Sequence, residues 1–117
     1  MDNKEKFMKT LDICIDLNSN VAESSACLAR AEKTTCEGFS AATNLIEIAM
    51  KTKDINLFTE VFNKTRKLIP DASKIDKELY RELIKQRNVF DRLVVKLVSQ
   101  HPSFMIKVII PSISRGK

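Results

Sequence analysis

The chain has 117 residues, of which 44% are hydrophobic and 30% charged, and its net charge is +5. A chain of this length is one domain and buries enough surface to fold, and its charged residues alternate with apolar ones, which argues against intrinsic disorder. Glycine occurs twice and proline three times. Because sheets with tight turns need more of both, the composition predicts helices joined by few breaks.

Residues 3–33 show apolar positions in alternating steps of four and three residues, the spacing of a helix that packs along one seam. The seam consists of Phe7, Leu11, Cys14, Asn18, Val21, Ser25 and Leu28. Asn18 and Ser25 are polar, and such residues fix the register of the packing or mark a break. The segment is therefore one long helix, or two helices that meet near Asn18 and Ser19.

Two further helices are predicted from their capping residues. Thr34 and Glu37 have the spacing of a capping box, which predicts a helix from Thr34 to about Met50. Asp54 is a good N-cap for the next helix, and Pro70 ends it because proline cannot continue a helix.

This pair of helices resembles a known repeat. Residues 39–72 resemble a single tetratricopeptide-type hairpin, with Phe62 near the aromatic position of the second helix and Pro70 at the end. Ile46 and Phe58 are large where that motif has small residues. A single repeat cannot bury its faces and no second copy is present, so we interpret the segment as an ordinary helical hairpin.

The last helix is predicted to start at Ser73 and to run to about Gln100. From Val89 to Val98 its apolar residues spread beyond one stripe, which is typical of a central helix or a subunit interface. The β-branched residues of 104–110 suit a strand, but no partner strand is predicted, so we expect a short helix that docks on the bundle.

The elements together predict an all-α protein, an irregular antiparallel bundle of about four helices plus a short C-terminal element. Residues 1–110 are expected to form a single helical domain, and residues 111–117 a flexible basic tail.

Positive charge is concentrated in the C-terminal half, since the net charge is −2 for residues 1–59, +4 for 60–96 and +3 for 97–117. On the predicted last helix, five bases lie within an arc of roughly 100°. This basic stripe consists of Lys77, Arg81, Lys85, Arg92 and Lys96. Three bases before Pro70 are candidates to extend it, namely Lys64, Arg66 and Lys67. This charge asymmetry predicts an acidic partner for the C-terminal half: nucleic acid, an acidic protein or an anionic surface.

The groups that catalysis requires are scarce. His101 is the single histidine, there is no close cysteine pair and no Glu-x-x-His motif, and the two glycines cannot form a phosphate loop. We therefore expect no enzyme activity, no metal and no cofactor. Cys14, Cys27 and Cys36 are odd in number and lack paired spacing, as free thiols of a reducing cytosol do. No segment has the pattern of a signal peptide or a membrane span, so we expect a soluble cytoplasmic protein.

The remaining features indicate binding. The apolar residues of the C-terminal part exceed what a small bundle needs and predict an interface. Its candidate residues are Val94, Val95, Val98, Phe104, Ile106 and Ile109. The interpretation favoured by the sequence is a helical adaptor, chaperone or inhibitor that acts by protein–protein contact as a homodimer. The alternative is backbone-directed nucleic-acid binding through the basic stripe.

Overall fold

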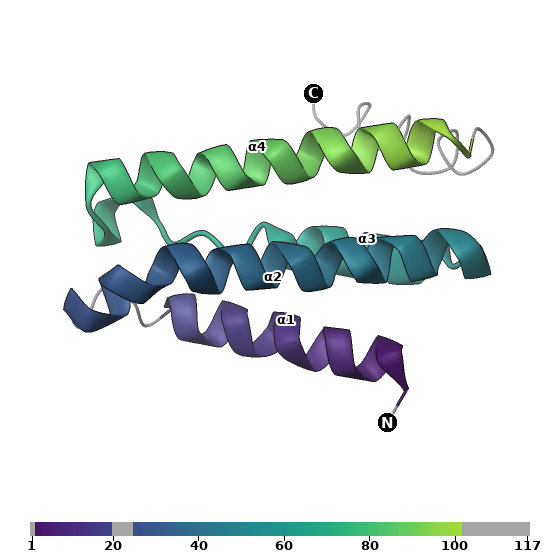
Figure 1. Ribbon diagram of the computed structural model, residues 1–117, viewed down its shortest axis with the longest axis horizontal. Coiled ribbons are helices and arrows are strands. Elements are labelled where there is room, and N and C mark those ends of the chain that lie inside the picture. Colours follow the sequence, from purple (N-terminus) through teal and green to yellow (C-terminus); the bar gives the residue numbers. More distant parts are fainter. Residues whose placement is uncertain (1, 20–24, 102–117) are drawn as a thin grey trace.

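The structure is a computed structural model that describes residues 2–19 and 25–101, with side chains from residue 30 onward in the second stretch (Figure 1). Within these residues the chain forms four α-helices and a short 3-10 turn at Ala72–Lys74. The helices are α1 (Asn3–Ser19), α2 (Ser25–Thr52), α3 (Ile55–Thr65) and α4 (Lys77–Ser99). Consecutive helices run in opposite directions, so the prediction of an all-α antiparallel bundle is confirmed. The predicted C-terminal element and tail lie outside the described residues.

Helix α2 is the centre of the bundle. It packs against each of the other three helices, whereas α1 and α3 touch only sparsely. Helices α1 and α4 form opposite edges of a slab of 45 × 39 × 19 Å (Figure 1). The buried residues of α2 spread over roughly half of its circumference at 100° per residue. They include Phe39, Ala41, Ala42, Leu45, Ile46, Ala49 and Met50.

The boundary between α1 and α2 corrects one prediction and decides an open one. The segment 3–33 belongs to two helices, because α1 ends at Ser19 and a separate helix begins at Ser25. The predicted helix start at Thr34 is wrong, since α2 continues through it without interruption. Its neighbour Thr35 is fully buried and bonded to Asn18, so tertiary packing overrides the local capping signal.

The later boundaries follow aspartate caps. The Asp54 carboxylate accepts a hydrogen bond from the Leu57 backbone N–H at 2.9 Å, which confirms the predicted cap of α3. The predicted start of α4 at Ser73 is wrong, because the helix begins at Lys77. The Asp76 carboxylate caps it and accepts hydrogen bonds from the backbone N–H groups of Glu78 and Leu79. An aspartate side chain at the N-cap position readily accepts hydrogen bonds from the free backbone N–H groups of the first helical turn. The predicted end of α4 is confirmed, with Gln100 as its C-cap.

A buried polar junction joins α1, α2 and the segment after α3. Asn18 is 2% exposed, and its side-chain Nδ2 donates to Thr35 Oγ1 at 2.8 Å and to the Leu68 carbonyl oxygen at 2.7 Å. Both hydrogens of the amide nitrogen are thus used, and three segments are held at one point. The junction fixes which residues of these segments face one another.

Gly38 allows the same three segments to approach closely. A Cβ atom at this position on α2 would lie 2.5 Å from Leu68 Cδ2 and 3.2 Å from Cys14 Cβ. Leu68 is fully buried, so its side chain has little room to move away. The glycine therefore supplies the space that Leu68 fills.

Helix α4 is attached to the bundle through an aromatic cluster and one ion pair. The Phe90 ring lies 5.0 Å from the Phe39 ring of α2 and 6.5 Å from the Phe62 ring of α3. Arg66 donates to both carboxylate oxygens of Asp91, at 2.6 and 3.1 Å, and its guanidinium carbon lies 4.4 Å from the Phe62 centroid. These contacts hold one side of α4 and leave the other side open.

Replacement of Asn18 tests the polar junction. Asn18→Asp keeps the shape of the side chain, but an ionised carboxylate only accepts hydrogen bonds and would face the Leu68 carbonyl oxygen. We expect a loss of about 1–3 kcal/mol in the free energy of unfolding, measured by urea denaturation. Asn63→Asp, an exposed change on α3, is the matched control and should cost little. Equal stability of both variants would contradict the junction.

Replacement of Gly38 tests the close approach. Alanine favours a helix interior over glycine by about 1 kcal/mol, so an unhindered site would gain stability. We expect Gly38→Ala instead to lower the thermal midpoint, because overpacking costs about 1–3 kcal/mol. Ser40→Ala, at an exposed position of the same helix, should be neutral or stabilising. A Gly38→Ala protein more stable than the parent would show that Leu68 relaxes freely.

Candidate protein-binding surface

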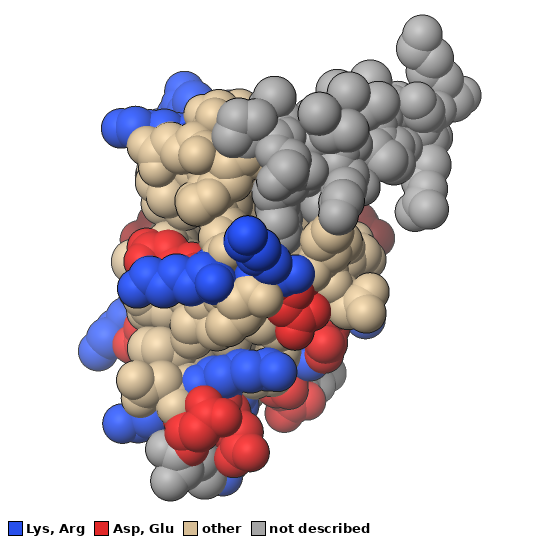
Figure 2. Space-filling model, turned by 90° about the vertical axis from the view of Figure 1, so that its right-hand side faces the viewer, with Lys and Arg blue, Asp and Glu red and all other residues tan. Residues whose placement is uncertain are grey.

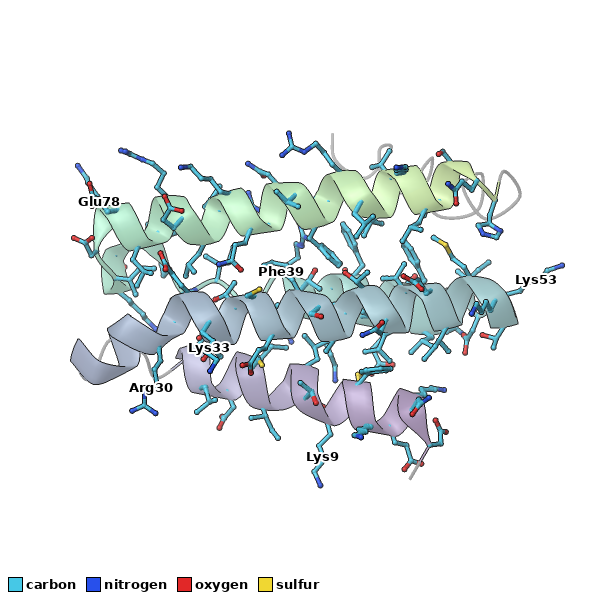
Figure 3. All side chains as sticks on the ribbon, viewed as in Figure 1. Lys9, Arg30, Lys33, Phe39, Lys53 and Glu78 are labelled. Atoms are coloured by element: carbon cyan, nitrogen blue, oxygen red, sulfur yellow. The ribbon has the colours of Figure 1, made fainter. Side chains whose placement is uncertain are left out.

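The five residues of the basic stripe are all exposed on α4. Long side chains that end in nitrogen extend from the side of α4 that faces away from α2 (Figure 3). Lys85 forms an ion pair with Glu82 at 3.1 Å, but both side chains are about half exposed or more, and such pairs contribute little. At the end of the slab seen in Figure 2, by contrast, basic and acidic side chains alternate. The stripe therefore concentrates positive charge at one edge.

The proposed extension of the stripe is largely neutralised. Lys64 Nζ lies 2.6 Å from an Asp12 carboxylate oxygen on α1 and 3.7 Å from Glu60. Arg66 is held by Asp91 in the contact described above. Lys67 is exposed. Lys64 and Arg66 thus join helices within the chain and do not lengthen the stripe as free charges.

An apolar groove of about 380 Å³ lies beside the stripe, between α2 and α4. Phe39 and Phe90 are buried residues of its lining, and Val89 and Leu93 are exposed by 59% and 37%. Polar residues at its margin are Cys36, Ser40, Thr43, Glu82, Lys85 and Gln86. The groove is thus an open hollow whose floor is continuous with the aromatic cluster that attaches α4.

The stripe and the groove adjoin on one helix. At 100° per residue, Val89 and Leu93 lie within roughly 60° of the edge of the stripe. Lys85 belongs to both features, since it lines the groove and stands in the stripe. Around the helix, Leu93 lies between the buried Phe90 and the exposed bases, and this position is the sequence signal that marks the groove.

The candidate apolar interface divides into three parts. Val94 and Val98 are 3% and 0% exposed and belong to the core of this chain, so they do not form a free interface. The reason is their helical position, which turns both toward α2 and α3. Val95 is 59% exposed, within the stripe. Phe104, Ile106 and Ile109 lie outside the described residues.

A second and larger groove, of about 810 Å³, separates α1 from α3. Its apolar lining is formed by Met8, Ile13, Leu17 and Leu57, of which Ile13 and Leu17 are exposed by 51% and 55%. Five acidic residues line it, namely Glu5, Asp12, Asp16, Asp54 and Glu60, against the bases Lys4 and Lys9. Sequence reasoning missed this groove, because it depends on how far α1 and α3 stand apart.

The two described cysteines, Cys14 and Cys36, differ in solvent exposure. Cys14 is buried, and its pKa is raised by desolvation and then by the nearby Glu37 carboxylate. This keeps the thiol protonated and suits a core residue. Cys36 is exposed at the margin of the α2–α4 groove. The thiol of Cys36 therefore reports on whether this groove is covered.

In the part of the chain that the structure describes, no cluster of histidine, cysteine and acidic side chains is arranged to hold a metal ion. None of the helices described is both long and apolar enough to cross a membrane. Comparison with protein-family models, with curated proteins and with solved structures found no match to this chain.

Proposed function

We propose that this protein is a non-enzymatic helical adaptor that binds an acidic amphipathic helix of a partner protein. The partner helix lies in the α2–α4 groove, with its apolar face on Val89 and Leu93 and its acids on the basic stripe. The observation that carries the proposal is the position of an open apolar groove beside a row of exposed bases on the same helix, the two features meeting at Lys85.

The two features have different roles in this binding. Burial of apolar side chains in the groove supplies most of the affinity, as in other complexes where a helix fills a groove. The stripe raises the association rate and selects against basic partners, because complementary charge steers the encounter. Val89 and Leu93, exposed by 59% and 37%, supply the apolar area that such binding removes from water.

Nucleic-acid binding through the stripe is the alternative, and two observations favour a protein partner. An apolar groove beside the bases has no role in phosphate contact, which is made by charged and polar groups. Lys64 and Arg66, which would widen a phosphate-binding surface, are paired with Asp12 and Asp91. The stripe alone is then a narrow row on one helix edge.

Binding of designed peptides tests the proposal. A labelled helical peptide with leucines on one face and glutamates on the other should bind, and its lysine counterpart should not. Arg81→Glu with Lys85→Glu and Arg92→Glu should weaken binding by about tenfold or more, through loss of charge complementarity. Fluorescence anisotropy measures the affinity, and circular dichroism checks that the fold is kept.

A pair of valines provides the matched control for the groove. Val89 and Val95 are both 59% exposed, but Val89 alone lines the groove. Val89→Asn should weaken binding of the glutamate peptide, and Val95→Asn should leave it nearly unchanged. Equal effects of the two changes would contradict binding in the groove. Steeply salt-dependent binding of labelled duplex or single-stranded nucleic acid, without peptide binding, would overturn the proposal in favour of phosphate recognition.

A further inference from the structure

The two edge helices carry exposed apolar residues. Among the described residues, the large hydrophobic side chains with the greatest exposure are Ile13, Leu17, Val89, Leu93 and Val95. The first two belong to α1 and the other three to α4, at opposite edges of the slab (Figure 1). Apolar exposure of this kind indicates a contact surface at each edge.

The charges of these edges are opposite. The α1–α3 groove is lined by five acids and two bases. Lys64 offsets part of this charge through Asp12 and Glu60, and the lining as a whole still holds more acids than bases. The α4 edge carries the basic stripe, with Val95 exposed among its bases. Each edge thus combines apolar area with the charge that the other lacks.

The stripe is long enough to span the acidic groove. Along α1, the groove extends from Lys4 to Leu17, about 20 Å at 1.5 Å per residue. Along α4, the stripe from Lys77 to Lys96 extends over about 28 Å on the same measure. A basic helix edge can therefore face the acidic groove along its whole length.

We infer that a second copy of this chain docks head to tail, with its α4 edge in the α1–α3 groove of the first copy. Val95 of the docked α4 meets the apolar lining near Ile13 and Leu17, and the bases of the stripe face the acids of the groove. Because the two surfaces differ, the contact is heterologous and produces rings or open chains, in contrast to a two-fold dimer.

This contact goes beyond the proposed adaptor function and limits it. The stripe is buried in the assembly, so an acidic helix and a second copy compete for the same edge of α4. The acidic α1–α3 groove stays unoccupied in a monomer and in the copy at one end of an open chain, where it can bind another basic surface. Association should weaken with salt, since the pairing charges are exposed before contact.

Sedimentation equilibrium of the whole chain, from micromolar to millimolar concentration, tests the contact. The parent protein should form species larger than a dimer at low salt. Two variants should each weaken association by about tenfold or more. One reverses the stripe with Arg81→Glu and Arg92→Glu, and the other reverses the groove with Glu5→Lys and Glu60→Lys. An equimolar mixture of the two should associate again, because each then offers the charge that the other needs.

Matched controls separate this contact from general charge effects. One control variant matches the net-charge change of the stripe variant and carries Lys33→Glu with Lys51→Glu. The other matches the net-charge change of the α1–α3 groove variant and carries Glu32→Lys with Glu47→Lys. All four positions are exposed on α2, outside the groove and the stripe, so association should persist. A parent protein that stays monomeric at low salt, or a dimer insensitive to the groove variant, would overturn the inference.

The outcome is independent of the peptide experiment. The variant with Glu5→Lys and Glu60→Lys changes the α1–α3 groove and keeps the α2–α4 groove. It should therefore still bind the glutamate peptide while it fails to self-associate. Val95→Asn should weaken self-association, although it leaves peptide binding nearly unchanged. A protein that binds the peptide but stays monomeric would overturn the head-to-tail contact alone.

Discussion

The buried amide of Asn18 must donate two hydrogen bonds inside the protein, and the rest of the arrangement depends on where it finds them. Thr35 and the Leu68 carbonyl oxygen accept them, so α1, α2 and the segment after α3 meet at one point. An unsatisfied buried amide costs more than a typical hydrogen bond gains, which restricts the register of all three segments. Gly38 then lets Leu68 fill the space beside this junction.

The consequence for α4 is that it is held from one side only. The junction places α2 at the centre and α3 behind it, where Phe62 can reach Phe90 and Arg66 can reach Asp91. No described segment covers the opposite side of the contact between α2 and α4, so Phe39 and Phe90 form the floor of an open groove. The same packing that anchors α4 therefore creates the surface on which the proposed partner helix lies.

The helices could be predicted from the sequence because their signals are local. The apolar spacing of α1, the Asp54 cap and the basic stripe all follow from periodicity and capping chemistry. The helix starts predicted at Thr34 and Ser73 are wrong for the same reason. Each residue is a good N-cap by local sequence, but other contacts determine where α2 and α4 begin. The grooves could not be predicted, because their width depends on distances between helices and not on any one helix. Even the exposure of Leu93 beside the buried Phe90 requires knowing that α3 lies on one side of α4 only.

The two edges of the slab carry opposite charge. The acids of the α1–α3 groove and the exposed bases of α4 lie toward opposite edges of the slab, so they do not neutralise each other within one molecule. Exposed charges of opposite sign at separate edges attract complementary surfaces, on a second copy or on partners of each kind. If the copies associate head to tail, an acidic partner must displace one of them to reach the stripe. Partner binding and assembly then oppose each other through a single helix edge, and the affinity for the partner falls as the protein concentration rises.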